Sequence, residues 1–135
     1  MQRNAKIVKE PNNFTKMNIE TLRQYCLSQK AVTEDMPFGE GTLVFRVMGK
    51  IFALMSLDES ECRINLKCDP EYAVELREQY PDIIPGYHMN KVHWNTVYCE
   101  RGIEDSLIRK LVVHSYELII KSLPKNLKAE LEKFE

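Results

Sequence analysis

The stretch LVFRVMGKIFALMSLDESECRINLKC, residues 43–68, decides the fold class of this 135-residue chain. Apolar and polar side chains alternate before Gly49-Lys50, and an apolar run returns after it; a two-residue Gly-X loop is typical of a type II′ hairpin turn. In CRINLKC the alternation continues, because Ile64 and Leu66 share one face of a strand. The other face carries Arg63, Asn65 and Lys67. The stretch therefore predicts three antiparallel strands with one buried and one polar face.

Helices are predicted on both sides of these strands. Before them, Asn18 is a favourable N-cap for a helix with apolar residues at helical spacing, ending near residues 30–32. After them, Asp69-Pro70 begins a helix that stops at Pro81. The predicted fold class is therefore α+β, with an antiparallel sheet packed against N- and C-terminal helices.

The C-terminal half continues this order. A further strand is predicted over residues 92–99, after the breakers Pro85-Gly86. A long helix is predicted over residues 104–122, with an apolar stripe at helical spacing. Pro124 ends it, and a short amphipathic helix follows.

Composition predicts one globular domain. Residues 1–16 are polar and without period, so we expect a flexible arm or leader there and a single domain over residues 17–135. The 19 basic and 20 acidic residues give a net charge of −1, which argues against a strongly basic nucleic-acid binder. No signal-peptide pattern or long apolar span is found, so we expect a monomeric cytoplasmic protein without membrane contact.

The four cysteines are Cys26, Cys62, Cys68 and Cys99. No pair has the C-x-x-C spacing of a zinc or redox site. Each lies in an apolar or alternating pattern, which predicts buried free thiols.

GYHMNKVHWNTV, residues 86–97, is the densest run of polar and aromatic side chains. His88 and His93 are five residues apart, which places them on opposite faces of a strand and about 140° apart on a helix. Carboxylates are absent from this run. We therefore expect neither a metal site nor a bound cofactor.

Nucleic-acid binding is the working hypothesis. If residues 91–97 form a strand, Lys91, His93 and Asn95 share one face, whereas Val92 and Trp94 share the other and hold the fold. We expect the polar face of the sheet and the hairpin tip to contact DNA, mostly at its phosphates, in a weak and salt-sensitive manner. The residues expected to bind DNA are Arg46, Lys50, Arg63, Asn65, Lys67, Lys91, His93 and Asn95.

Three alternatives stay open. The polar run is a wall of the fold without further function, or it belongs to a small-ligand or protein-binding module. In the second case, we expect a pocket around Tyr87, His93 and Trp94, against the last helix, lined by Tyr87, His88, Trp94 and Tyr98. The third alternative is an enzyme without a recognised motif. We expect no catalysis, because Cys99 or Ser115 would need to meet His93 or His114 in the fold.

The chain resembles a known family. TEDMPFGEGTLVFRV, RINLKCDPE and LREQYPDIIPGYHMNKVHWNTV are similar to segments of the MmcQ/YjbR-like proteins, which have a CyaY-like fold. The resemblance covers about residues 17–125. It implies a small bacterial cytoplasmic protein of the double-wing DNA-binding type, with no assigned catalytic residues. Lys30 and Val92 depart from the family pattern, in which Pro and a second Lys are common at these positions.

Overall fold

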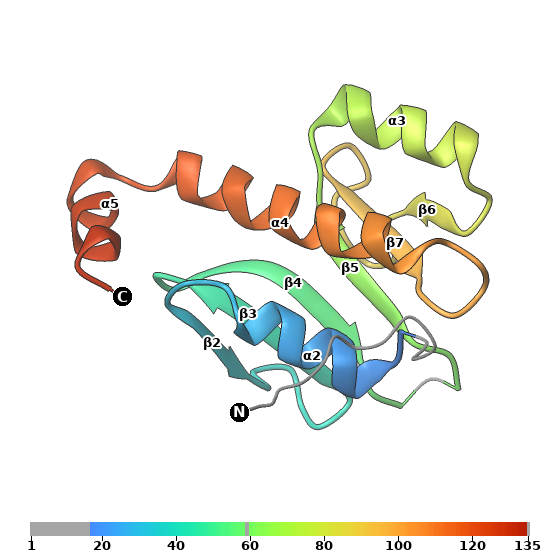
Figure 1. Ribbon diagram of the computed structural model, residues 1–135, viewed down its shortest axis with the longest axis horizontal. Coiled ribbons are helices and arrows are strands. Elements are labelled where there is room, and N and C mark those ends of the chain that lie inside the picture. Colours follow the sequence, from blue (N-terminus) through green and yellow to red (C-terminus); the bar gives the residue numbers. More distant parts are fainter. Residues whose placement is uncertain (1–16, 59, 135) are drawn as a thin grey trace, which may run out of the picture.

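A computed structural model describes residues 17–58 and 60–134, so the arm predicted for residues 1–16 lies outside the described residues. The described chain forms one sheet with the strand order β2-β3-β4-β5-β7-β6, in which all neighbouring strands are antiparallel (Figure 1). The elements are α2 (Ile19–Leu27), β2 (Val32–Asp35), β3 (Thr42–Val47), β4 (Lys50–Ser56), β5 (Arg63–Lys67), α3 (Pro70–Gln79), β6 (Ile83–Pro85), β7 (Trp94–Tyr98), α4 (Asp105–Ser122) and α5 (Lys125–Glu132). The predicted α+β class is confirmed.

The register of the strands defines two faces of the sheet. We call the face that packs against α3 and α4 the inner face; one row across it is Phe45, Ala53, Leu66 and Asn95. We call the opposite side the outer face; the neighbouring row, Val44, Leu54, Asn65 and Thr96, points there. The inner face, α2, α3 and α4 share one apolar core. Ile64 and Leu66 are buried in it, as their alternation predicts.

The β3–β4 hairpin differs from the prediction at its turn. Val47 pairs with Lys50, so the turn residues are Met48 and Gly49, whose φ angles are 50° and 86°. Two positive φ angles fit a type I′ turn, and the predicted Gly49-Lys50 turn is therefore wrong by one residue. The sequence did not reveal the position of the turn, because Met48 is apolar and reads as a continuation of the apolar strand before it. Lys50 is the first residue of β4.

A β-bulge in β4 fixes the long helix to the sheet. Arg46 pairs with Ile51 and Phe45 with Ala53, so Phe52 is the extra residue. The β4–β5 pairing runs as far as Ala53 and Leu66. At the next position the hydroxyl of Ser115 lies between the strands: it accepts from Lys67 N at 2.9 Å and donates to Phe52 O at 2.6 Å. One hydroxyl of α4 thus bridges β4 and β5.

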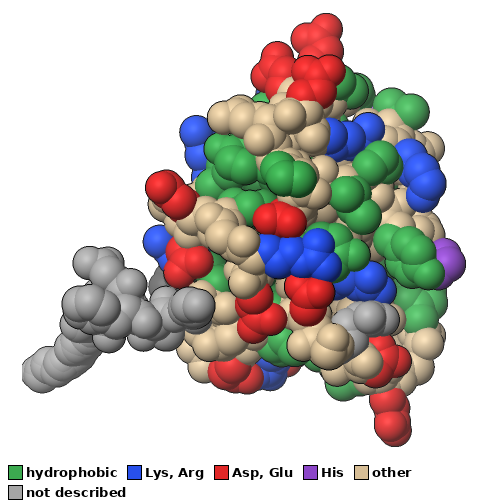
Figure 2. Space-filling model, turned by 90° about the vertical axis from the view of Figure 1, so that its right-hand side faces the viewer, with side chains coloured by type: hydrophobic (Ala, Val, Ile, Leu, Met, Phe, Trp, Pro, Cys, Tyr) green, Lys and Arg blue, Asp and Glu red, His purple; other side chains and the backbone are tan. Residues whose placement is uncertain are grey.

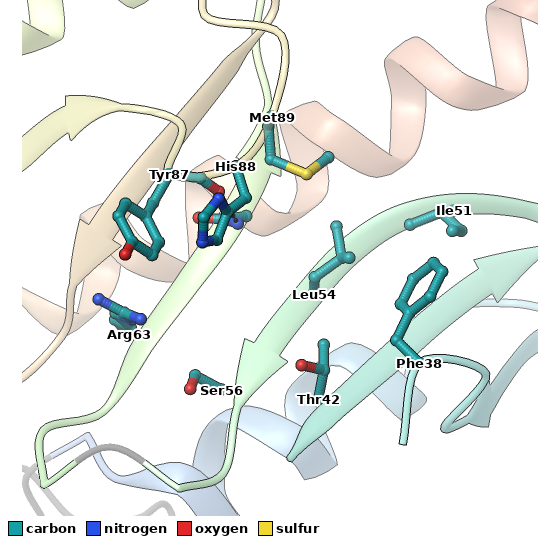
Figure 3. A pocket seen from close by; sticks show the side chains of 10 residues that line it. Phe38, Thr42, Ile51, Leu54, Ser56, Arg63, Tyr87, His88 and Met89 are labelled. Carbon is teal, nitrogen blue, oxygen red and sulfur yellow. Dashed lines mark hydrogen bonds between the residues drawn. The ribbon is translucent and has the colours of Figure 1, made fainter. Parts of the chain in front are cut away.

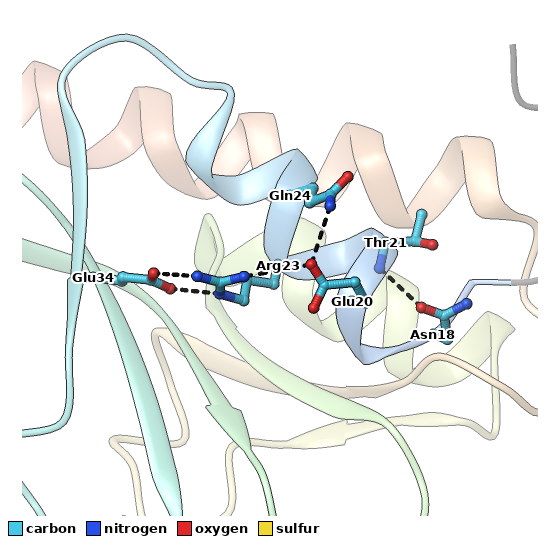
Figure 4. A network of polar contacts seen from close by, with 6 residues as sticks. All are labelled: Asn18, Glu20, Thr21, Arg23, Gln24 and Glu34. Carbon is cyan, nitrogen blue, oxygen red and sulfur yellow. Dashed lines mark hydrogen bonds and ion pairs between the residues drawn. The ribbon is translucent and has the colours of Figure 1, made fainter. Parts of the chain in front are cut away.

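Two predicted helix caps are confirmed. The Asn18 side chain accepts a hydrogen bond from Thr21 N at 2.8 Å, and the Asp69 side chain accepts one from Tyr72 N at 3.2 Å. Figure 4 shows how α2 is also tied to the edge strand β2. Arg23 donates to both carboxylate oxygens of Glu34, at 2.8 and 2.6 Å, in the forked geometry that suits a guanidinium.

The long helix α4 crosses the sheet, as Figure 1 shows. Its predicted apolar stripe is buried, including Ile108, Leu111, Val112, Ser115 and Ile119. α5 follows Pro124 as predicted. Its Leu131 is buried, but Phe134 lies beyond the helix and is 48% exposed. No helix of residues 17–58 and 60–134 is both long and apolar enough to cross a bilayer.

The edge strands are the elements that the sequence pattern did not predict. β2, with the sequence VTED, has acidic residues at half its positions. β6 has only three residues and begins two residues after Pro81. Such short, charged or proline-bounded strands are typical of sheet edges. The strand predicted over residues 92–99 comprises only Trp94–Tyr98, and residues 91–93 form a turn.

Candidate functional site

The loop between β6 and β7, residues 86–93, is closed by its own backbone. Gly86 N donates to Trp94 O at 2.8 Å, and Trp94 N donates to Asn90 O at 3.0 Å. The Asn90 side chain accepts from the amides of Val92 and His93, at 2.9 and 3.2 Å. This is the turn role expected of asparagine. A Cβ at Gly86 would lie 2.8 Å from the Cβ of Trp94, so a glycine is required there.

Arg77 of α3 holds this loop from the inner face. Its Nε donates to Asn95 Oδ1 at 2.6 Å, and its Nη2 donates to the carbonyls of Lys91 and Trp94. Lys91 Nζ in turn donates to Gly86 O at 2.8 Å, across the mouth of the loop. Two cationic side chains therefore donate hydrogen bonds to backbone carbonyls of this loop.

The outer face of the sheet holds the same loop from its other side. Tyr87 N donates to the Thr96 hydroxyl at 2.9 Å, and that hydroxyl donates to Asn65 Oδ1. Asn65 Nδ2 donates to Tyr87 O at 3.3 Å. The guanidinium of Arg63 lies over the Tyr87 ring, 5.0 Å from its centroid, and the His88 ring lies 4.0 Å from the Tyr87 ring. Thr96 is fully buried as a result.

A pocket of about 320 Å³ lies on the outer face, beneath this loop. We call it the outer pocket. The floor comes from β3, β4 and β5, and the walls come from the 36–41 segment and residues 87–89, as Figure 3 shows. Its lining residues are Phe38, Thr42, Ile51, Leu54, Ser56, Arg63, Asn65, Tyr87, His88 and Met89. The rim residues Phe38 and Tyr87 are 67% and 50% exposed.

The residues expected to bind DNA do not form one surface. Arg63, Asn65 and Lys67 lie on the outer face of β5, and Lys50 is exposed beside the hairpin turn. Arg46 shares the outer face on β3, but its side chain is 3.0 Å from the carboxylate of Asp35 and donates to Gly49 O. On the side that Figure 2 shows, Lys and Arg side chains are interspersed with acidic and apolar ones.

The predicted common face of Lys91, His93 and Asn95 is wrong. Lys91 and His93 are exposed residues of a turn, whereas Asn95 is 2% exposed and belongs to the inner face. Among the described residues, Asn95 Nδ2 is the buried side-chain atom without a hydrogen-bond partner. The predicted burial of Val92 is also wrong, since it is 58% exposed. The error comes from extending the period of a strand through a turn.

The predicted pocket residues separate in the structure. Tyr87 and His88 line the outer pocket. We had expected the pocket to lie against the last helix, but the outer pocket lies on the face of the sheet opposite α4. His93, Trp94 and Tyr98 do not line it. Trp94 is half-buried, and Tyr98 stacks under Arg101, whose Cζ is 3.8 Å from the ring centroid.

Most lining residues were missed from the sequence. Ile51, Leu54 and Ser56 lie on the outer face of β4, in an apolar run whose sequence does not show which side chains face the core. Phe38 belongs to a segment without secondary structure. The one available signal was its aromatic side chain between Pro37 and Gly39, in a turn-rich segment.

The two side chains considered as nucleophiles, Ser115 and Cys99, are buried. Ser115 has no exposed surface, and both hydrogen bonds of its hydroxyl are made to the backbone. Hydrogen bonding to Cys62 and burial raise the pKa of the Cys99 thiol, which disfavours the nucleophilic thiolate. Burial also raises the pKa of Cys26 and of Cys68 to about 12. All four cysteines are buried free thiols, as predicted.

His114 has a packing role. Its Nε2 accepts a hydrogen bond from Asp69 N at 3.2 Å, and its ring lies edge-on to Tyr72 at 5.3 Å. Burial lowers the pKa of His114, which favours the neutral ring that this hydrogen bond requires. Within the described ranges, no three His, Cys, Asp or Glu side chains gather as metal ligands would.

Comparison with known proteins places the chain in a family. Residues 27–118 match the family model YjbR. YbdF of Escherichia coli is 41% identical over 106 residues, which cover 78% of this chain and 87% of YbdF. YjbR of Escherichia coli is 34% identical over 108 residues, which cover 80% of this chain and 92% of YjbR.

Solved structures agree with this assignment. The crystal structure of a Deinococcus radiodurans protein with a DUF419 domain superposes with a TM-score of 0.79 at 36% identity, covering 84% of this chain and 86% of that one. A Pseudomonas syringae protein superposes with a TM-score of 0.67 at 30% identity, covering 76% and 98%. The match to the family model and the likeness to these relatives over more than three quarters of the chain show that it belongs to the YjbR family.

Proposed function

We propose that this protein binds a small, mostly apolar organic molecule in the outer pocket, without catalysing a reaction. The observation that carries the proposal is the pocket itself, whose volume of about 320 Å³ lies at the lower end of the range of small-molecule sites, roughly 300–1,000 Å³. Apolar side chains with a few polar groups are the lining that such sites use.

The rigidity of the loop supports this proposal. Residues 86–93 are held by Arg77 from one side and by Asn65 and Thr96 from the other. A wall fixed in advance lowers the entropic cost of binding, because the ligand need not order it. The exposed aromatic rings of Phe38 and Tyr87 offer apolar surface that a ligand would cover.

Leu54→Lys tests this proposal. Leu54 lies at the floor of the pocket, so a lysine there places a charge in it. We expect the neutral dye N-phenyl-1-naphthylamine to bind the wild-type protein at one saturable site, measured by fluorescence. The variant should bind it at least about tenfold more weakly, which corresponds to roughly 1.4 kcal/mol.

Val74→Lys is the matched control. Val74 is 49% exposed on α3, so the same charge is added away from the pocket, and dye affinity should be unchanged. Thermal melting of both variants checks that they are folded. Equal dye affinity in Leu54→Lys and wild type would show that the dye binds elsewhere and would remove the support for the pocket.

DNA binding is the second candidate function. The observation that favours it is the row of Arg63 and Lys67 on the outer face of β5, with exposed Lys50 at the neighbouring hairpin. Two other expected contacts do not support it: Asn95 is buried, and Lys91 donates to Gly86 O. Fewer available cations mean fewer phosphate contacts and a weaker interaction.

A salt titration distinguishes this candidate from the first. If DNA is bound through this row, affinity for mixed duplex DNA should fall with salt by about one logarithmic unit per unit of log salt for each phosphate contact. The pair Lys50→Gln and Lys67→Gln should weaken DNA binding and leave dye binding intact, since neither residue lines the outer pocket. No binding at low salt, or binding insensitive to salt, would rule out DNA as the partner.

A further inference from the structure

Two of the four buried cysteines face each other at one end of the β5–β7 pair. Arg63 pairs with Tyr98, and in the same antiparallel register Cys62 faces Cys99, one residue beyond each strand. A backbone hydrogen bond of 3.0 Å from Cys99 N to Cys62 O closes this position. The two cysteines are far apart in the sequence, so only the pairing of the strands brings them together.

The geometry of this position suits a disulfide bond. Directly opposite residues of an antiparallel pair project to the same face, with Cα atoms about 4.5–5.5 Å apart. A disulfide joins residues whose Cα atoms are roughly 4.4–6.8 Å apart. Cys62 and Cys99 both belong to the apolar core and are 2% and 3% exposed. Their sulfurs can therefore bond without a change in the pairing of the strands.

The two thiols differ in reactivity. Hydrogen bonding with Cys99 lowers the pKa of the Cys62 thiol, although burial acts against this effect. The proton of Cys99 is also within reach of Val97 O, which lies 3.5 Å from Sγ. Because the thiolate is the nucleophile in thiol oxidation, Cys62 is the sulfur that reacts first with an oxidant, and Cys99 is the thiol beside it.

The position of the pair gives a small oxidant a way in. Residues 60–62 and 99–102 lie outside the strands, so the pair lies where regular pairing ends. Cys62 N donates to a side chain there, the Glu100 carboxylate, at 3.0 Å. The ends of paired strands open locally at a lower cost in free energy than their centres. Hydrogen peroxide is small enough to enter through such an opening.

We propose that Cys62 and Cys99 are a site of reversible oxidation, at which hydrogen peroxide forms a disulfide bond between them. The Cys62 thiolate attacks one peroxide oxygen, the O–O bond breaks, and the leaving hydroxide takes up the thiol proton as water. Cys99 then attacks the sulfur of the Cys62 sulfenic acid, the S–O bond breaks, and a second water leaves with the Cys99 proton. Each sulfur loses one electron and the peroxide gains two. A dithiol reductant reverses the reaction by exchange.

Peptide mapping of the folded wild-type protein tests this proposal. After treatment with hydrogen peroxide in native buffer, the remaining thiols are alkylated in urea and the chain is digested with trypsin without reduction. Each cysteine falls in a separate tryptic peptide, so the linkage is read directly by mass spectrometry. We expect the peptides of Cys62 and Cys99 to be joined and the number of free thiols to fall from four to two. Dithiothreitol should restore all four.

Alanine variants assign the two roles. In Cys99→Ala we expect no disulfide and a sulfenic acid at Cys62 that dimedone traps. In Cys62→Ala the oxidation of Cys99 should be at least about tenfold slower, because the more reactive thiol is gone. Cys68→Ala is the matched control: it removes an equally buried thiol from the other end of β5 and should change neither the linkage nor its rate. Circular dichroism checks that the variants are folded.

The stability of the oxidised protein gives a second readout. A disulfide formed in the native register restricts the unfolded chain, so oxidised wild type should melt about 5 °C or more above the reduced protein. A melting temperature at or below that of the reduced protein would show that the bond distorts the pairing of β5 with β7, and it would overturn the proposal.

Three mapping results would also overturn it. The first is a bond from Cys62 to Cys26, the third thiol near the pair. The second is a sulfinic acid at Cys62 with Cys99 left free. The third is a reaction seen only in urea, which would show that the folded protein does not admit the oxidant.

Discussion

Replacing Arg77 by Met is expected to lower the free energy of unfolding by about 3 kcal/mol. Arg77 donates to Asn95 Oδ1 at 2.6 Å and to the carbonyls of Lys91 and Trp94. Asn95 is 2% exposed and its Nδ2 already lacks a protein partner, so the variant leaves the whole amide unsatisfied in the core. Buried polar groups without partners cost about 1–3 kcal/mol each. Urea unfolding followed by circular dichroism measures the loss.

The same variant also tests whether Arg77 positions the wall of the outer pocket. Freed from α3, residues 86–93 are expected to move, so dye affinity should fall together with stability. Arg109→Met, at an exposed position of α4, is the matched control and should change neither quantity.

A double-mutant cycle with Asn95→Leu measures the Arg77–Asn95 contact itself. Adding this change to Arg77→Met removes both partners of the buried hydrogen bond, so the double variant should recover about 1–2 kcal/mol relative to the sum of the single losses. Purely additive losses would show that the two side chains are not coupled.

Replacing Ser115 by Ala is expected to cost a similar amount, about 3 kcal/mol. The Ser115 hydroxyl accepts from Lys67 N at 2.9 Å and donates to Phe52 O at 2.6 Å, at the bulge where β4 and β5 stop pairing. Its removal leaves the Lys67 amide and the Phe52 carbonyl without this partner, and Ser115 and Phe52 have no exposed surface. The midpoint of urea unfolding should fall while its slope stays unchanged.

Ser122→Ala is the control for this change. Ser122 lies in the same helix, is exposed, and its hydroxyl donates to Ile119 O within the helix. Its loss should change stability by less than about 0.5 kcal/mol. A loss below about 1 kcal/mol in Ser115→Ala would contradict the bridging role, and it would mean that β4 and β5 close directly across the bulge.

Local patterns gave correct predictions where a single chemical rule acts over neighbouring residues. Asn18 and Asp69 cap their helices because a short side-chain acceptor reaches an amide three residues on. The alternation from Arg63 to Lys67 places Ile64 and Leu66 in the core, since strand period and burial coincide there. The apolar stripe of α4 was predicted in the same way, from the helical spacing of neighbouring residues.

The same rules failed where the backbone leaves a regular element. Asn95 was assigned to the outer face by continuing a strand period through residues 91–93, which form a turn. The β4 bulge at Phe52 likewise shifts the faces of β4 by one residue, and no residue type announces it.

By itself, the amino-acid sequence was sufficient for the fold class and for the caps and core of its main elements, because these depend on residues a few positions apart. The outer pocket depends on long-range pairing instead. Phe38, Leu54, Arg63 and Tyr87 become its neighbours only because β3, β4 and β5 pair in one register and Arg77 and Asn65 hold residues 86–93 above them. Contacts between residues far apart along the chain follow from the packing of the whole sheet, which no local pattern encodes.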